Sequence, residues 1–183
     1  FRFLHGIAAF PKPLIAAVDG FAFGAGFSLA LMADFVLATP RARFCLSFMR
    51  VGLGPDFAAM YTLPRIVGVQ RAKELMLSAR EVPADEALRL GIAMELVPPG
   101  GLMDRARALA RSFGGASRVA TARIKRDVGM SLATDLHGLL SLEADHQAMC
   151  FETAYQAEAV NRFLNKQPAM FQWPAAADPS KKE

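Results

Sequence analysis

The chain has 183 residues, 53% of them hydrophobic, and a formal net charge of +4. Its length and composition allow a substantial core, which indicates a soluble globular protein of one domain with a helical appendage. The longest run without a charged residue, 20–33, falls short of the roughly 18 apolar residues of a membrane span, so we expect no membrane partner.

The cysteines and histidines predict neither a disulfide framework nor a metal centre. Cys45 and Cys150 lie far apart, as is typical of reduced thiols, so we expect a cytoplasmic protein. His5, His137 and His146 have no ligand-like spacing with the cysteines. We therefore predict no metal site.

Basic residues dominate the segment 41–80, where only Asp56 and Glu74 are acidic. This excess is either a solvated basic face or an attraction for an anionic small molecule. Aromatic residues are not interleaved with the basic ones, so we expect no nucleic-acid partner.

The most informative segment begins with a short apolar run, 15–18, which predicts a strand buried on both faces. Asp19-Gly20 interrupts it, and Gly24-Ala25-Gly26 precedes a segment of helical propensity, 27–33. The first N–H groups of such a helix lack internal partners and lie at its positive end. They could hold a phosphate, a carboxylate or a developing oxyanion, unless the glycines merely permit tight packing of helix on strand.

Further along, breakers and apolar periodicity predict alternating strands and helices, then helices alone. Residues 2–10 are typical of a helix already under way, and 51–56 of a breaker-rich loop. The predicted strands are 35–38, 43–48 and 93–97. The predicted helices are 57–66, 69–78, one beginning at Pro83 and ending before Gly91, 102–113, 117–128, 134–151 and 154–164. We thus expect an α/β part over 1–115, a helical part over 116–171 and a flexible tail over 172–183.

Residues 11–26, followed by Asp34, resemble the signature of the enoyl-CoA hydratase/isomerase (crotonase) family. The resemblance extends from Phe1 to about Phe171. Its further segments are 42–44, 51–56, 63–68, 74–77 and 87–91. It implies an α/β spiral of β-β-α turns and C-terminal helices that pack subunits into homotrimers or hexamers. It also implies an acyl-CoA substrate, with coenzyme A present as part of that substrate and no permanently bound cofactor.

The resemblance assigns an oxyanion hole to the glycine turn. In the family, the thioester carbonyl lies between two backbone N–H groups, and Ala25, between Gly24 and Gly26, would supply one. The second donor comes from a segment that precedes the position of Phe1. We expect that the printed sequence begins part-way through a longer protein, because residues 2–10 lack a helix cap; the alternative is a truncated homologue without this donor.

The positions of the family's two catalytic glutamates are occupied by Ser28 and Phe48. Water addition by the usual pair is therefore in doubt. Asp56 lies where several isomerases of the family have their acidic residue, which implies proton shuttling. Independently, three apolar neighbours predict a desolvated Asp56 whose protonated form is favoured, namely Val51, Leu53 and Phe57. The alternative is that Asp56 caps a helix beginning at residue 57.

The remaining site residues are predicted to bind substrate. Ser28 could hold a water or be structural, and Phe48 would line the acyl pocket beside Val51. Phe163 and Lys166 match positions that reach the coenzyme A bound by a neighbouring subunit; otherwise they are a core phenylalanine and a snorkelling lysine. The full predicted substrate-binding set is Gly24, Gly26, Ser28, Phe48, Val51, Phe163 and Lys166.

These features favour an acyl-CoA enzyme that shifts a double bond through Asp56. One alternative is an enoyl-CoA hydratase (lyase) with non-standard catalytic residues. Another is a non-catalytic acyl-CoA binder or structural subunit, and a third is a phosphate or nucleotide binder using the glycine turn.

Overall fold

The computed structural model describes residues 2–175, which divide into two compact units. One is built mainly from Leu14–Arg107, and the other from Ala9–Pro13 and Ala108–Pro174. The division between the units falls inside helix α6 (Leu102–Ser112). The sequence pattern predicts the boundary between the α/β part and the helical part after residue 115. Residues 176–183 of the predicted tail lie outside the described residues.

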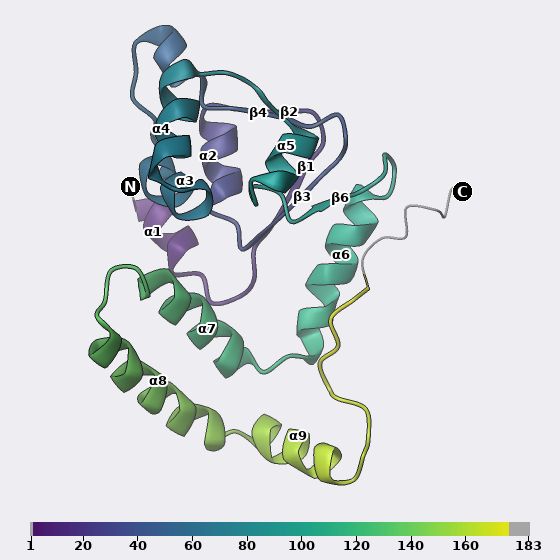
Figure 1. Ribbon diagram of the computed structural model, residues 1–183. Coiled ribbons are helices and arrows are strands. Elements are labelled where there is room, and N and C mark those ends of the chain that lie inside the picture. The colour runs from purple at the N-terminus through teal and green to yellow at the C-terminus, as the bar shows by residue number, and fades with distance from the viewer. Residues whose placement is uncertain (1, 176–183) are drawn as a thin grey trace. The chain divides into compact units, whose positions relative to one another are not determined.

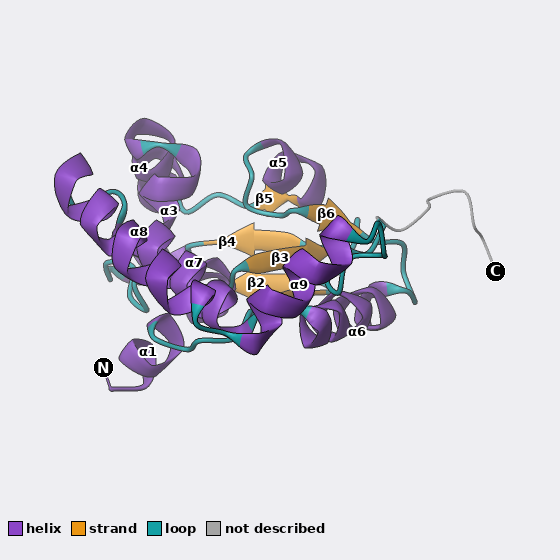
Figure 2. Cartoon of the chain, turned by 90° about the horizontal axis from the view of Figure 1, so that it is seen from below, coloured by secondary structure: helices purple, strands orange, loops and turns teal. Residues whose placement is uncertain are grey.

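Two small sheets form the centre of the first unit (Figures 1 and 2). In one, β3 (Phe35–Ala38) lies between and parallel to β1 (Ile15–Val18) and β6 (Glu95–Leu96), with Ile15 opposite Phe35. In the other, β4 (Arg43–Cys45) pairs in parallel with β2 (Phe21–Phe23) and antiparallel with β5 (Val82–Pro83). The strands predicted at 15–18 and 35–38 are confirmed at the same bounds.

The short strand β2 was not predicted, because three residues between Gly20 and Gly24 are too few for a recognisable alternation. The extended segment predicted at 43–48 is only partly correct. Its first half is β4, and its second half enters the 3₁₀ helix η1 (Ser47–Val51), which ends at Gly52 with a positive φ of 72°. β1 and β2 therefore precede α2, β3 and β4 follow it, and each strand of the first pair lies parallel to its counterpart in the second.

The turn between β1 and β2 is fastened to the turn between β3 and β4 by Asp19. Its carboxylate accepts hydrogen bonds from Thr39 Oγ1 at 2.7 Å and from Arg41 Nε at 2.6 Å. These two contacts, Arg41 first, lower the pKa of Asp19 from 3.8 to about 2. The ends of the parallel strands β1 and β3 are thus held together by a charge-assisted contact.

The main core lies where helices cover the sheets of this unit. Phe27 and Phe44 are fully buried with ring centroids 5.2 Å apart, and Leu63 and Leu75 complete the centre of the cluster. α3 and α4 pack side by side, and α3 also contacts α2 (Figure 1). The helices of this unit are α1 (Arg2–Ala8), α2 (Ala25–Leu31), α3 (Ala59–Val67), α4 (Val69–Ser78) and α5 (Ala84–Arg89).

A second cluster in the same unit joins the sheet to the start of α6. Leu37, Val97 and Leu102 are buried together, and beside them Arg105 donates to Glu95 at 2.8 Å. Only 7% of the Arg105 side chain and 14% of the Glu95 side chain are exposed. This pair therefore interacts with little solvent screening.

The second unit consists of helices whose caps match the sequence. Ser117, Asp135 and Thr153 each accept a hydrogen bond from the backbone N–H three residues later. The helices after Ser117 and Asp135 begin one and two residues later than predicted, and the helix after Thr153 begins at the predicted residue. In each case the cap lies immediately before the helix. After the 3₁₀ helix η2 (Phe113–Gly115) come α7 (Arg118–Met130), α8 (Leu136–Phe151) and α9 (Ala154–Leu164). Within residues 2–175, no helix is both long and apolar enough to span a membrane.

Candidate functional site

The glycine turn is closed by hydrogen bonds on both sides of Gly24. Gly24 has φ 52° and ψ −123°, a conformation that residues with a Cβ rarely adopt. Its N–H donates to the carbonyl of Cys45 at 2.8 Å, and its own carbonyl accepts the N–H of Ser28 at 3.1 Å. The turn is therefore fixed between the end of β4 and the first turn of α2.

The backbone N–H of Ala25 is available to a ligand. Ala25 is the first residue of α2, and within residues 2–175 its N–H donates to no protein acceptor. Its side chain is half-buried, and the next residue, Gly26, is exposed with open space around its α-carbon. The structure thus presents a fixed donor with room on one side, as an oxyanion requires.

Ser28 belongs to the turn. Its side chain is fully buried, and its hydroxyl donates to the carbonyl of Gly24 at 3.2 Å. Its hydroxyl is thus engaged within the turn, which favours the structural alternative, and the predicted contact with substrate stays a prediction. Burial of the hydroxyl is compensated because it has this partner.

Phe48 lies against the glycine turn. A Cβ placed on Gly24 would be 3.8 Å from Phe48 Cζ and 3.6 Å from Ser47 Oγ. Phe48 is half-buried against the main core, while Val51, at the end of the same 3₁₀ helix, is 70% exposed. Of the two predicted pocket residues, the structure therefore brings Phe48 to the turn and leaves Val51 at the surface.

Asp56 lies in the loop that follows η1, and it is exposed. The predicted burial is wrong: of the three neighbours that were expected to cover it, Val51 and Leu53 are themselves 70% and 58% exposed, and the half-buried Phe57 does not cover it. Among the described residues, its carboxylate makes no ion pair or hydrogen bond. It is thus an uncommitted carboxylate on the loop before α3, and α3 packs against α2.

Asp56 does not cap a helix with its side chain. α3 begins at Ala59, two residues later than predicted, and its N-cap, Ala58, makes no side-chain cap. Phe57 and Ala58 have positive φ values of 49° and 62°, which residues with a Cβ seldom adopt. Such strain persists only where the surrounding structure imposes it, and it is concentrated at functional sites.

The two residues predicted to reach coenzyme A lie at the end of α9 in the second unit. Phe163 is 81% exposed, so the alternative of a core phenylalanine is wrong. Lys166 is exposed and has a positive φ of 54°, and its N–H donates to the carbonyl of Phe163 at 3.2 Å. This turn presents both side chains to solvent.

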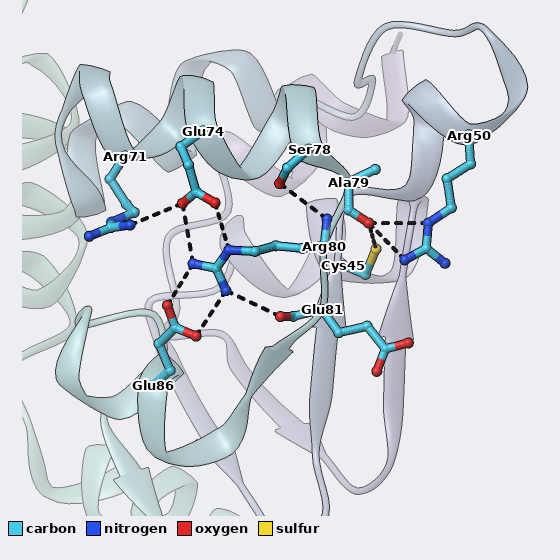
Figure 3. A network of polar contacts seen from close by, with 9 residues as sticks. All are labelled: Cys45, Arg50, Arg71, Glu74, Ser78, Ala79, Arg80, Glu81 and Glu86. Atoms are coloured by element: carbon cyan, nitrogen blue, oxygen red, sulfur yellow. Dashed lines mark hydrogen bonds and ion pairs between the residues drawn. The ribbon is translucent and has the colours of Figure 1, made fainter.

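Sequence reasoning missed a cluster of polar contacts around Ala79, the residue that ends α4 (Figure 3). The buried Cys45 thiol donates to the Ala79 carbonyl at 3.1 Å, and burial raises the pKa of this thiol. Arg50 donates to the same carbonyl. No local signal could have revealed the contact, since Arg50 and Ala79 lie 29 residues apart.

The described residues offer no metal centre, and they form a concavity that the glycine turn does not line. Residues 2–175 contain no group of three or more His, Cys, Asp or Glu side chains able to hold a metal ion. A concavity of about 660 Å³ lies within the second unit, lined among others by Arg118, Tyr155 and Arg162. None of the residues predicted to act on a substrate lines it.

Comparison with known proteins identifies the family. The sequence model of "Enoyl-CoA hydratase/isomerase" matches residues 2–174. The chain is 36% identical over 165 residues to a crotonyl-CoA hydratase of Syntrophomonas wolfei. The aligned region covers 90% of this chain and 64% of that protein. It is 35% identical over 165 residues to a 1,2-epoxyphenylacetyl-CoA isomerase of Escherichia coli, and this aligned region covers 90% of this chain and 63% of that protein.

A solved structure extends the agreement to three dimensions. An enoyl-CoA hydratase/isomerase from Cupriavidus metallidurans is 48% identical and superimposes with a TM-score of 0.93, covering 96% of this chain and 67% of that one. The predicted α/β spiral is thereby confirmed. The chain spans less than two thirds of the length of the two sequence relatives above. By sequence and by fold, it belongs to the enoyl-CoA hydratase/isomerase family.

Proposed function

We propose that the protein acts on acyl-CoA thioesters and shifts a double bond in an enoyl-CoA. The observation that carries this proposal is the unpartnered N–H of Ala25, fixed by the hydrogen-bonded turn at Gly24. A thioester oxygen placed on this N–H gains stabilisation as it becomes an enolate oxygen, and the donor needs no reorganisation. Coenzyme A is part of the substrate.

The proposed reaction moves one proton between two carbons. The Asp56 carboxylate removes a proton from C2 of a 3-enoyl thioester, and the electron pair passes to the carbonyl oxygen held at Ala25. The protonated Asp56 then returns the proton to C4. The electrons flow back from the oxygen, the double bond lies between C2 and C3, and Asp56 is again a carboxylate. One uncommitted carboxylate suffices for both transfers.

Water addition is the competing reaction, and the relative in Syntrophomonas wolfei is named a hydratase. Water addition needs two acid–base groups, whereas the double-bond shift needs one. Ser28 is buried and bonded to Gly24, and Phe48 has no ionisable group, so neither replaces a glutamate. This arrangement favours the isomerase over the hydratase.

A homo-oligomer, trimeric or hexameric, forms part of the proposal. Several large apolar side chains of the second unit are exposed, which is typical of a surface that another subunit covers. These include Ile124, Val128, Leu132, Leu136, Leu140, Phe151, Phe163 and Leu164. In the assembly, Phe163 and Lys166 would contact coenzyme A bound by a neighbouring subunit. Both cysteines are free, in keeping with a cytoplasmic location.

The decisive experiment supplies the purified protein with 3-enoyl-CoA and with 2-enoyl-CoA and follows the absorbance of the conjugated thioester. We expect conjugation to appear from the 3-enoyl substrate. Asp56→Asn should lower kcat by about 10²- to 10⁴-fold and leave acyl-CoA affinity nearly unchanged. Asp104→Asn is the matched control, because Asp104 is also exposed and its ion pair within the described part of the chain is with the surface residue Arg107. Wild-type turnover in Asp56→Asn would refute the proposed role, and turnover of the 2-enoyl substrate alone would favour the hydratase.

A further inference from the structure

The carbonyl of Ala79 joins three elements of the first unit (Figure 3). It accepts hydrogen bonds from Arg50 Nε at 3.1 Å and Arg50 Nη2 at 2.7 Å, and from Cys45 Sγ at 3.1 Å. Ala79 is buried and ends α4 with a positive φ of 48°. Because the last carbonyls of a helix lack N–H partners and lie at its negative end, a guanidinium that donates twice suits this position.

The neighbouring residue, Arg80, holds the Ala79 carbonyl in place. Arg80 Nε donates to Glu74 at 2.6 Å, and Arg80 Nη2 donates to Glu86 at 2.7 Å. Glu74 belongs to α4 and Glu86 to α5, so Arg80 ties the two helices together directly beside Ala79 (Figure 3). The carbonyl is therefore a fixed anchor for any group that binds it.

The other end of the contact is η1, which contains both Arg50 and Phe48. Phe48 packs beside Gly24, and its carbonyl accepts the N–H of Leu53 at 3.0 Å as the chain turns toward Asp56. Among the described residues, Arg50 is the residue of η1 that donates side-chain hydrogen bonds to another element. Arg50 thus adds a polar contact between elements to the core packing of Phe48.

We propose that Arg50 is a positioning residue, which holds η1 on the Ala79 carbonyl and so fixes Phe48 as the wall beside the oxyanion donor. The part of this inference that concerns catalysis rests on the proposed function. A wall held in one place favours acyl groups of one size. If Phe48 moves by about 1 Å, kcat falls by up to about 10²-fold, because the reacting groups are no longer aligned.

The test compares Arg50→Met, Arg50→Lys and the matched control Arg43→Met. Methionine keeps an apolar stem but no donor, and lysine restores a charge with a single-point contact. Arg43 also donates to backbone carbonyls, those of Ala42 at 2.9 Å and Pro40 at 3.3 Å, but these lie in the turn directly before β4. Two measurements are made on each protein: hydrogen exchange at the amides of Gly52 and Leu53, and kcat and KM for enoyl-CoA substrates of increasing acyl length.

We expect Arg50→Met to speed exchange at both amides at least tenfold, to lower kcat about tenfold with the preferred substrate, and to flatten the preference among acyl lengths. Arg50→Lys should recover part of each effect, and Arg43→Met should match the wild type. Wild-type exchange in Arg50→Met overturns the inference, and so does faster exchange with unchanged kcat and acyl preference. If the wild type converts no enoyl-CoA, the proposed function fails instead, and the exchange rates alone decide whether Arg50 holds η1.

Discussion

Replacing Ala25 by proline removes the proposed oxyanion donor while changing little else. Ala25 is the first residue of α2, the helical position that tolerates proline best, because its N–H has no partner within the helix. In this structure the N–H has no protein acceptor among residues 2–175, so its deletion breaks no hydrogen bond that stabilises the fold. The substitution therefore separates catalysis from folding.

The expected magnitude follows from the role of the donor. Loss of one oxyanion-hole donor typically lowers kcat by about 10²- to 10³-fold, which corresponds to roughly 2.7–4 kcal/mol of transition-state stabilisation. The free energy of unfolding should change by less than about 1 kcal/mol. Acyl-CoA affinity should change less than kcat, because the enolate oxygen binds the donor more strongly than the ground-state carbonyl oxygen does.

The assay is initial-rate turnover of a 3-enoyl-CoA, measured beside thermal unfolding of the same preparation. Ala154→Pro is the control, because Ala154 is the exposed first residue of α9. Turnover in Ala25→Pro within about threefold of the wild type, in a protein that unfolds normally, would refute the role assigned to this N–H. A matching loss in Ala154→Pro would show that proline acts through folding.

Three further predictions concern stability, each measured by chemical unfolding. Gly24→Ala should destabilise the protein by about 1–3 kcal/mol, because Gly24 has a positive φ. Gly26→Ala should stabilise it by about 0.5–1 kcal/mol, because Gly26 lies in a helix and has open space around it. Equal effects of the two substitutions would contradict this reasoning. Arg105→Ala should cost about 3–5 kcal/mol, because it removes the positive charge that lies beside the largely buried Glu95 carboxylate. Arg107→Ala, in an exposed pair, should cost less than about 1 kcal/mol, and similar costs would contradict the role of burial. The Asp19 carboxyl has a lowered folded-state pKa of about 2, so its contribution is complete above its ordinary value of 3.8 and is lost as the pH falls toward 2. Asp19→Asn should therefore reduce the acid sensitivity between about pH 4 and 2, and an unchanged profile would refute this.

Local patterns in the sequence predicted much of the first unit. The apolar run 15–18 between breakers forms β1 at the predicted bounds, and 69–78 forms α4. Pro83, predicted to begin a helix with an acidic first turn, is the N-cap of α5, which begins one residue later. These features are determined by neighbours within a few residues, so a linear reading is sufficient for them.

Predictions that concerned burial and contact were less successful. Asp56 has apolar neighbours in sequence yet is exposed, because Val51 and Leu53 also face solvent. α3 begins late, because Phe57 and Ala58 take positive φ values that no propensity favours. Exposure and imposed backbone strain depend on what packs around a segment, and the sequence alone does not contain that information in readable form.

The glycine turn shows both sides of this division. By itself the sequence determined that Gly24-Ala25-Gly26 begins a helix with free N–H groups, and its resemblance indicated the family, because turn chemistry and helix ends are local properties. Only the tertiary structure decided that Ser28 closes this turn, that Phe48 lies against it, and that Arg50 reaches Ala79 to hold Phe48 there. The contacts of Phe48 with Gly24 and of Arg50 with Ala79 join residues that are distant in the chain, and the burial of Ser28 depends on its surroundings, so all three form only when the helices and strands pack.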